Sequence, residues 1–377
     1  MPRLSSSSYP ENMVTTFLKA FLSLYEASYL ALEGENILDE ARAFTSVYLK
    51  GLQRKINSGL MEEVNHALEL PRHYRMFRPE ARWYLNANDK RRDANRVLLD
   101  LAKLDFNMVQ SILQSELQDV ARVGMVECFF WAAGMVFEPQ LNECRKGLAK
   151  VVALLTTIDD VYDVYGSLEE LQLFTHAVER WDLDALETLR DYMKPCFLTL
   201  YNTVNEMAQE THEEQSVNTM PHHLSRAVAT GVVLLTHAYF LLSKDITKNS
   251  LENLDLFHPL LLDSSLIFRL CNDLDTSKAE LEGRICKFII VLHEGERVSE
   301  EVARKHIRSL TDETWKKMNK HRLANDSPFG KLFTEMAINL ARNAECAYQK
   351  GDGHRDPDTH AKNRISSVVF QPLELTE

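Results

Sequence analysis

The sequence predicts an all-α protein built from two helical domains. Through most of the chain, apolar residues recur every three or four positions, which is the spacing of one buried face of an α-helix. No strand-like alternation of apolar and polar residues persists. The 377 residues include only 13 Gly and 11 Pro, and this composition favours long helices joined by few turns.

The first domain is expected to span residues 1–90. Apolar stripes predict helices from residue 15 to about residue 70, with one face buried at every turn. These stripes consist of Leu18, Phe21, Leu22, Leu24 and Tyr25, and then, within residues 37–52, Ala41, Phe44, Val47 and Tyr48. Residues 70–95 are different because prolines, asparagines and the basic run Lys90–Arg92 interrupt the pattern. We place the domain junction near residue 90 and expect the basic run to be a solvated linker.

The second domain is expected to span residues 91–377 and to be helical again. Its first helix is predicted from the apolar residues Val97, Leu98, Leu101, Leu104 and Phe106. Further helices are expected at Met125–Phe137, which is rich in aromatic residues, at Gly147–Tyr165 and at Pro259–Leu281. A polar stretch at residues 210–223 separates the last two.

Composition and charge exclude several classes of protein. With 45% hydrophobic and 26% charged residues in 43.4 kDa, the chain belongs to the globular class. A formal net charge of -12 argues against a nucleic-acid partner, because phosphate backbones are bound by basic faces. An acidic protein can still bind a small polyanion if metal ions lie between the carboxylates and the phosphates.

Neither the cysteines nor the apolar segments indicate an extracellular or membrane-spanning protein. The six cysteines are scattered without Cys-x-x-Cys or zinc-finger spacing, so we expect buried free thiols and a reducing compartment. No apolar run reaches the roughly 18–20 residues needed to cross a bilayer, and the longest, at 151–158 and 232–242, predict buried helices. The N-terminus lacks an apolar signal region, and the chain is expected to be soluble and mature or trimmed.

Two rows of oxygen-bearing side chains predict a metal site. Asp159 and Asp163 lie four residues apart and therefore share one face of a helix. Asn272, Thr276 and Glu280 repeat the same spacing over two turns further along the chain. Mg²⁺ and Mn²⁺ prefer such oxygen donors and commonly reach a protein through carboxylates together with substrate phosphates. The two rows, facing each other across a helical bundle, would hold a metal-bound diphosphate.

The two rows also match both metal motifs of a known family, the class I terpene synthases of plants. The Asp-Asp-x-x-Asp motif stands at 159–163, and the Asn/Asp-Asp-x-x-Ser/Thr-x-x-x-Glu motif stands at 272–280. The chain resembles that family further at Glu80–Trp83, Leu104–Asn107, Glu127–Trp131, Phe137–Gln140, Val164–Gly166 and Phe268–Cys271. The resemblance implies two α-helical domains, with the active site in the C-terminal class I terpenoid synthase bundle.

The chain departs from the family pattern in several places. Its first domain is short and lacks the family's Arg-Arg-x₈-Trp element. Family stretches are also missing near residues 120–121, 223–228 and 283–287. At Arg122-Val123-Gly124, only the first member of the family's Arg-Asp-Arg remains.

The resemblance implies ionisation of an allylic prenyl diphosphate, with Mg²⁺ or Mn²⁺, three ions in all, bound together with the diphosphate. The ligands are expected to be Asp159, Asp163, Asn272, Thr276 and Glu280, and Asp160 is expected to pair with a basic group beside them. Two arginines are expected to face the diphosphate. One is Arg269, one helical turn before Asn272, and the other is Arg122.

A carbocation needs an aromatic, dry container, because cation–π attraction stabilises it without reacting with it. Trp131 is the first candidate for this wall and Tyr348 the second, whereas Phe129, Phe130 and Tyr239 are expected to be packing residues. The segment with His354 resembles the family's closing loop. His222-His223 is expected to be a surface loop and not a metal site.

Overall likeness to mint-family monoterpene synthases implies geranyl diphosphate as the substrate, conversion to a monoterpene, and a place in the plastid stroma. A sesquiterpene synthase acting on farnesyl diphosphate is the near alternative, and a catalytically inactive isoprenoid-binding protein is the alternative from another class. The row Asn272, Thr276 and Glu280 argues against a prenyl-chain elongating enzyme. A monomer or a homodimer is expected.

Overall fold

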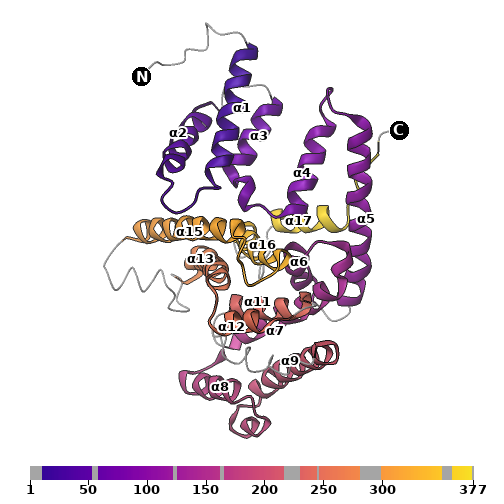
Figure 1. Cartoon of the computed structure of the whole chain (residues 1–377), viewed down its shortest axis with the longest axis vertical. Coiled ribbons are helices and arrows are strands. Elements are labelled where there is room, and N and C mark those ends of the chain that lie inside the picture. The colour runs from indigo at the N-terminus through magenta and orange to yellow at the C-terminus, as the bar shows by residue number, and fades with distance from the viewer. Residues whose placement is uncertain are drawn as a thin grey trace.

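Helices make up all the regular secondary structure of the residues that the structure describes (Figure 1). The computed structural model describes residues 11–52, 58–121, 125–161, 165–215, 230–243, 246–280, 299–349 and 359–375. Within these ranges no residue is in a strand, so the all-α prediction is confirmed.

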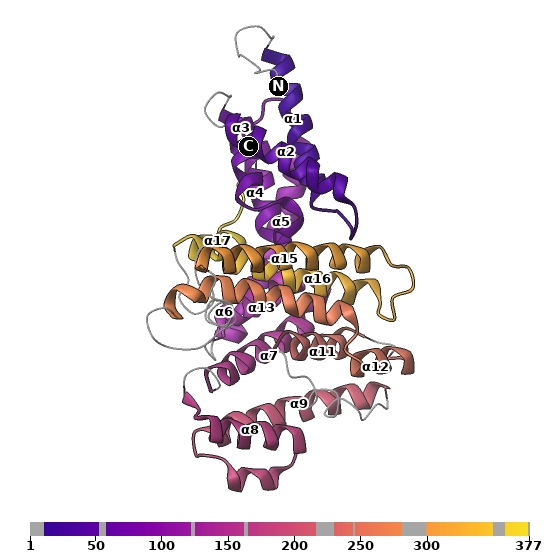
Figure 2. The same ribbon diagram turned by 90° about the vertical axis from the view of Figure 1, so that its left-hand side faces the viewer.

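Three helices form the group at the N-terminal end: α1 (Glu11–Ser28), α2 (Asn36–Leu52) and α3 (Ser58–Glu69). They stand together at one end of the molecule in both Figures 1 and 2. Their shared core consists of Leu18, Tyr25, Leu49, Leu60, Val64 and Ala67.

The expected buried face of α2 is wrong in part. Val47 is 71% exposed and Phe44 is 47% exposed, whereas Thr45 and Leu49 are fully buried. Burial of a threonine is possible here because its hydroxyl donates to the carbonyl of Ala41, 2.7 Å away on the preceding turn. The buried face of α2 therefore differs from the face that side-chain hydrophobicity alone predicts.

The next two helices, α4 (Phe77–Asp89) and α5 (Arg96–Ala121), follow the short helix η1 (Arg72–Tyr74) and pack side by side. The last helix, α17 (Thr359–Val369), returns to pack against both. Asn107 of α5 fixes the C-terminal segment by donating to the carbonyl of Leu373 and accepting from its N–H, each at 2.8 Å.

The residues of α5 chosen from the sequence divide between solvent and core. Phe106 is buried, but Val97, Leu98 and the two leucines that follow at 101 and 104 are exposed in the described structure. Lys90–Arg92, in the turn between α4 and α5, is exposed as expected. The division into domains near residue 90 remains a prediction.

The other helices form the C-terminal bundle and its extension. Their bounds are α6 (Val126–Met135), η2 (Pro139–Leu141), α7 (Asn142–Asp160), α8 (Leu168–Arg180), η4 (Leu183–Thr188), α9 (Met193–Gln215), α11 (Thr230–Leu242), α12 (Lys248–Asp255), α13 (Pro259–Glu280), α15 (Glu300–Leu323) and α16 (Lys331–Ala347). One large core runs through α6, α7, α11, α13 and α16. Helices α8 and α9 lie at the end of the molecule opposite α1 (Figure 2).

Two glycines allow helices of the bundle to approach closely. A Cβ added to Gly134 on α6 would lie 2.4 Å from the Asn343 side chain on α16. A Cβ added to Gly231 on α11 would lie 2.9 Å from the Ser265 backbone on α13. Real Cβ atoms do not come so close to backbone, so α13 can sit at this distance from α11 only because residue 231 is glycine.

The helix expected at Gly147–Tyr165 is shorter than predicted, since α7 ends at Asp160. Beyond it, the N–H of Gly166 donates to the carbonyl of Val161 at 2.8 Å, which is the i→i+5 bond of a π-turn. Single π-turns inside or at the end of α-helices are frequent at functional sites. Asp159 therefore lies next to the point where the regular α-helix ends.

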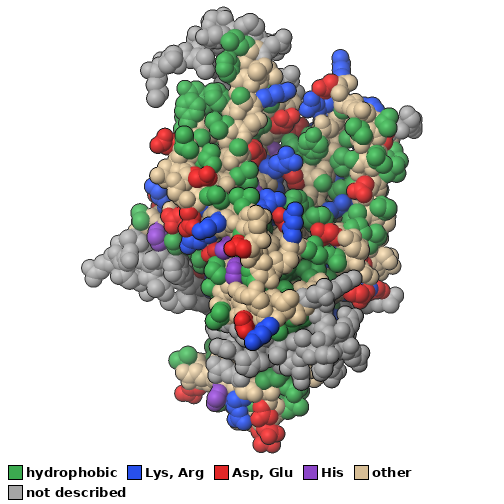
Figure 3. All heavy atoms as spheres, viewed as in Figure 1, with side chains coloured by type: hydrophobic (Ala, Val, Ile, Leu, Met, Phe, Trp, Pro, Cys, Tyr) green, Lys and Arg blue, Asp and Glu red, His purple; other side chains and the backbone are tan. Residues whose placement is uncertain are grey.

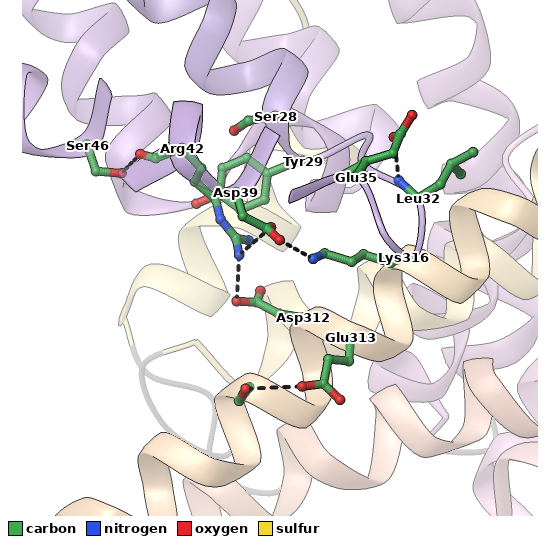
Figure 4. Close-up of polar contacts among 12 residues, drawn as sticks. Ser28, Tyr29, Leu32, Glu35, Asp39, Arg42, Ser46, Asp312, Glu313 and Lys316 are labelled. Atoms are coloured by element: carbon green, nitrogen blue, oxygen red, sulfur yellow. Dashed lines mark hydrogen bonds and ion pairs between the residues drawn. The ribbon is translucent and has the colours of Figure 1, made fainter. Parts of the chain in front are cut away.

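Polar contacts tie the N-terminal helices to the bundle (Figure 4). Arg42 on α2 pairs with Asp312 on α15 at 3.2 Å, and Lys316 on α15 pairs with Asp39 on α2 at 2.6 Å. Asn319, one turn beyond Lys316, donates to the carbonyl of Tyr29 at 3.0 Å. The C-terminal half of α15 is thus held by α2 and by the segment that follows α1.

The five cysteines in the described part are free thiols, and four of them are buried. Burial raises the pKa of Cys128 to about 11 and that of Cys144 to about 12, so both stay protonated at neutral pH. None of the helices in the described ranges combines the length and the apolar character that a bilayer crossing requires. On the face seen in Figure 3, acidic and basic side chains are interspersed.

Candidate active site

Asp159 of the first predicted metal row lies on α7, and the second predicted row lies on α13; both helices pack against α11. Asp159 lies in the last turn of α7, and Asn272 lies in the C-terminal half of α13; both side chains are half-buried. The C-terminal ends of α7 and α13 lie on the same side of the molecule (Figure 2). The helix ends that bear Asp159 and Asn272 therefore lie towards one side of the bundle.

The described donors fit a hard divalent cation, because a carboxylate and an amide oxygen are the ligands that Mg²⁺ and Mn²⁺ prefer. The rest of the predicted ligand set is outside the described side chains. Asp163 lies outside the described residues, and for Thr276 and Glu280 only the helical backbone of α13 is described. Among the side chains that are described, no group of three or more His, Cys, Asp or Glu could hold a metal ion.

Arg269 is held by an aspartate that the sequence analysis did not single out. Its Nε atom lies 3.0 Å from Oδ1 of Asp273, one turn further along α13. The Asp273 side chain is only 3% exposed, whereas that of Arg269 is 55% exposed. A buried carboxylate thus pairs with one edge of the guanidinium, and the Arg269 side chain as a whole is exposed.

Three aromatic rings from three helices meet beside the second metal row. The Trp131 ring on α6 lies edge-to-face with Phe268 on α13, with centroids 5.5 Å apart. Tyr348, at the end of α16, lies 6.1 Å from both of these rings. The two aromatic residues chosen from the sequence are therefore brought together, and Phe268, one turn before Asn272, completes the group.

The position of Trp131 is fixed from α16. Asn343 donates from Nδ2 to the carbonyl of Trp131 at 2.8 Å, and Asn339 donates to the carbonyl of Met135 at 3.0 Å. These bonds satisfy carbonyls in the last turns of α6, and Gly134 lies between them on the same helix. The aromatic group is thus held by backbone contacts as well as by ring packing.

Several predicted residues lie outside the described part of the chain. They are Arg122, Asp163, His222, His223 and His354, together with the side chain of Asp160. The packing roles expected for Phe129 and Tyr239 fit the structure, since both are buried in the core and Tyr239 stacks edge-to-face with Phe333 at 5.2 Å.

Two further residues of α13 contact predicted site residues and were missed: Phe268, which packs on Trp131, and Asp273, which pairs with Arg269. Both had a signal in the sequence: Phe268 lies four residues before Asn272, and Asp273 lies four residues after Arg269. Because residues four apart share one face of a helix, the spacing argument that selected Asn272 and Arg269 would also have selected Phe268 and Asp273.

Models of known protein families match three parts of the chain. The family model "Terpene synthase family, metal binding domain" matches residues 110–232. The model "Terpene synthase family 2, C-terminal metal binding" matches residues 213–317, and "Terpene synthase, N-terminal domain" matches residues 5–68.

Characterised relatives match nearly the whole chain. A chloroplastic tricyclene synthase of Medicago truncatula is 48% identical over 94% of this chain and 70% of its own length. A chloroplastic isoprene synthase of Populus alba is 44% identical over 94% of this chain and 68% of its own length. A chloroplastic (E)-beta-ocimene synthase of Matricaria chamomilla var. recutita is 43% identical over 97% and 69%.

Solved structures share the fold. Isoprene synthase of Populus x canescens, in complex with three Mg²⁺ ions and dimethylallyl-S-thiolodiphosphate, superposes with a TM-score of 0.89 at 43% identity, covering 99% of this chain and 80% of that one. Limonene synthase with 2-fluorolinalyl diphosphate gives a TM-score of 0.89 at 33% identity, covering 99% and 77%. The chain thus belongs to the plant terpene synthase family and is a lyase that forms terpenes in a metal-dependent reaction.

Proposed function

We propose that this terpene synthase ionises geranyl diphosphate, converts the cation to a monoterpene and releases diphosphate. The observation that carries the proposal is the group of three rings, Trp131, Phe268 and Tyr348, beside the helix that bears Asn272. An aromatic wall next to an anion-binding helix suits a substrate that separates into a carbocation and a diphosphate. The relatives named for tricyclene, ocimene and myrcene, which are ten-carbon hydrocarbons, support the ten-carbon substrate.

The proposed ligands of the divalent metal ions, Mg²⁺ or Mn²⁺, are Asp159, Asp163, Asn272, Thr276 and Glu280. Bound ions would neutralise the negative charge that develops on the leaving diphosphate. The three Mg²⁺ ions in the isoprene synthase structure support a set of three.

Arg269 and Arg122 are the proposed diphosphate-binding cations. Arg269 lies on α13 with its guanidinium held at one end by Asp273, so its free N–H groups are oriented before the substrate arrives. Orientation in advance matters because charge on the leaving oxygen develops only during ionisation, when a donor already in place costs no reorganisation. Asp273 is therefore a positioning residue for Arg269.

Arg269→Lys is expected to lower kcat by about tenfold to a hundredfold, although the charge is kept. Lysine has no planar fork, so it cannot pair with Asp273 on one edge while presenting two parallel N–H groups to the diphosphate. Steady-state release of diphosphate and inhibition by added inorganic diphosphate measure the effect. Arg322→Lys, on the exposed pair of α15 with Glu335, is the matched control and should leave both unaltered. Unchanged turnover and unchanged diphosphate inhibition in Arg269→Lys would exclude this arginine from the site.

Trp131→Leu is expected to shift the products towards acyclic compounds quenched early, while ionisation continues. The substitution removes a cation–π partner that contributes about 0.5–2 kcal/mol, enough to change how competing cation paths divide. Product ratios from gas chromatography measure it, alongside the metal concentration needed for half-maximal rate, which should not change. An unaltered product ratio in a folded variant would show that Trp131 only packs.

The substrate is tested by incubating the protein with geranyl, farnesyl and dimethylallyl diphosphate, each with and without Mg²⁺, and identifying the volatile products. Isoprene synthases are among the relatives at 44% identity, so a five-carbon substrate is the second candidate. Farnesyl diphosphate tests the sesquiterpene alternative. The highest kcat/KM with geranyl diphosphate would support the proposal. If none of the three substrates gave a metal-dependent product, the alternative of a catalytically inactive isoprenoid-binding protein would be favoured.

We also propose that the protein acts in plastids, because its relatives carry chloroplastic names. A fluorescent fusion of the full-length gene product in leaf cells tests this. The stroma, the mint-family subtype and the state as monomer or homodimer remain predictions, the last to be read from light scattering after gel filtration.

A further inference from the structure

An acidic residue that belongs to neither metal row lies on α16, the helix that ends at Tyr348 of the aromatic cluster. Glu345 is on α16, one turn before Tyr348, and its side chain is half-buried. On the neighbouring helix α13, Cys271 occupies the corresponding place, one turn after Phe268 and directly before Asn272. Burial raises the pKa of the Cys271 thiol, and the nearby charge of Glu345 on α16, which packs against α13, raises it further.

The Glu345 carboxyl is held by an aromatic stack that begins near the N-terminal helices. Trp315 on α15 is fully buried and donates its Nε1–H to Oε1 of Glu345 at 2.9 Å. The Trp315 ring stacks on Tyr74 with centroids 4.3 Å apart, and Tyr74 lies edge-to-face with Tyr29 at 5.2 Å. A rigid indole thus fixes one oxygen of the carboxyl.

The titratable groups near Glu345 come from α15, η1 and α13, which all pack against α16. Helix α15 contributes Asp312, one turn before Trp315, whose charge is paired with Arg42. The short helix η1 contributes Tyr74, and α13 contributes Cys271. Helix α11 has no Asp, Glu, Lys or Arg in its sequence, and α6 has only a glutamate in its first turn. Burial raises the pKa of the Glu345 carboxyl to about 7, the Trp315 hydrogen bond opposes this rise, and the negative charge of Asp312 adds to it.

We propose that Glu345 is a positioning residue for the ionisation step, whose carboxylate places a negative charge beside the Phe268 and Tyr348 side of the aromatic cluster. The proposal rests on the proposed function, since it needs a carbocation in the cluster. Coulomb attraction to a fixed anion lowers the energy of the cation without contact. Because the hydrogen bond to Trp315 fixes the carboxyl, the anion favours positive charge in the pocket without being free to move to where it could capture the cation.

Glu345→Gln separates this role from a structural one. Glutamine has the same shape and its Oε1 can still accept from Trp315, but it carries no charge. The variant is expected to lower kcat about tenfold with KM changed by less than about twofold, because charge acts on the transition state and not on the bound ground state. Glu313→Gln, at an exposed position on the neighbouring helix α15, is the matched control and should keep the wild-type kcat.

The pH profile of kcat gives a second, signed readout. In the wild type, kcat should fall as the pH drops through about 7, where Glu345 gains its proton, and this inflection should be absent in Glu345→Gln. Trp315→Phe removes the hydrogen bond that favours the carboxylate, so the inflection should move to higher pH. Asp312→Asn removes the neighbouring negative charge, so it should move to lower pH.

Fluorescence provides a readout that needs no turnover. Tryptophan emission of the wild type, titrated without substrate, should show a midpoint near pH 7 that disappears in Glu345→Gln, because the carboxyl is bonded to the Trp315 indole. All variants are compared with the wild type by circular dichroism, and the kinetics use whichever prenyl diphosphate the wild type prefers. A different preferred substrate would overturn the ten-carbon proposal but leave this one standing. Unchanged kcat in Glu345→Gln, or midpoints of Trp315→Phe and Asp312→Asn that do not move apart, would overturn the role of Glu345.

Discussion

Asp159→Asn is expected to lower kcat by about a hundredfold or more while leaving the helical fold intact. The substitution keeps the size of the side chain but replaces a charged oxygen ligand with a neutral amide. The metal-bound diphosphate would then lose part of the charge balance on which ionisation depends. Asp163→Asn, at the other end of the same motif, should have an effect of the same order. Diphosphate release at several Mg²⁺ concentrations measures both, and half-maximal rate should require more metal in each variant.

Glu143→Gln is the matched control for these variants. Glu143 lies in the first turn of α7, at the end of the helix opposite Asp159, and its side chain is 80% exposed. Loss of its charge should leave kcat and the metal dependence at wild-type values. Near-normal metal-dependent turnover in a folded Asp159→Asn protein would contradict the assignment of the first metal row.

Sequence periodicity was sufficient for the helical class of the fold but less reliable for the faces of individual helices. In α1, Leu18 and Tyr25 are buried as predicted. In α2, Val47 is 71% exposed while Thr45 is buried, because a threonine hydroxyl can bond to its own helix and then enters a core like an apolar group. A pattern of side-chain hydrophobicity does not reveal that local hydrogen bond.

The metal rows could be predicted from the sequence because the prediction needs only the spacing of residues that are near one another in the chain. The structure describes the side chains of Asp159 and Asn272, and the full ligand set remains a prediction. The aromatic cluster was readable only in part. Trp131 and Tyr348 were chosen one at a time, but their meeting with Phe268 depends on how α6, α13 and α16 cross. That crossing is set by contacts distant in sequence, such as the bond from Asn343 to the Trp131 carbonyl and the missing side chain at Gly134.

The largest effect on stability is expected from Arg145, a charged residue that the sequence analysis passed over inside the apolar pattern of α7. Its side chain is fully buried, and it bonds to both oxygens of Glu116 on α5, at 2.8 and 2.7 Å. It also donates to the carbonyls of Val136, Glu138 and Pro139, in the segment that joins α6 to α7. One guanidinium therefore links α5, α7 and the connection between α6 and α7.

Arg145→Met is expected to lower the free energy of unfolding by about 3–5 kcal/mol, because it leaves the Glu116 carboxylate buried without its counter-charge. Urea denaturation followed by circular dichroism measures the loss. Lys146→Met is the matched control: Lys146 joins the same two helices through Asp119 at 3.3 Å, but Asp119 is 61% exposed, so its loss should cost less than about 1 kcal/mol. A loss in Arg145→Met no larger than in this control would contradict the prediction.

The double variant Arg145→Met with Glu116→Leu separates the two parts of the Arg145 contribution. Removing both charges abolishes the unpaired carboxylate, so stability should recover partly from the single variant. Recovery should stay incomplete, because the three carbonyls at residues 136, 138 and 139 would still lack their donor and each unsatisfied buried group costs about 1–3 kcal/mol. If the double variant regained full wild-type stability, the carbonyl bonds would contribute nothing and the ion pair alone would account for the effect. Since those carbonyls belong to the connection that follows the Trp131 helix, the remaining deficit should also appear as a changed product ratio.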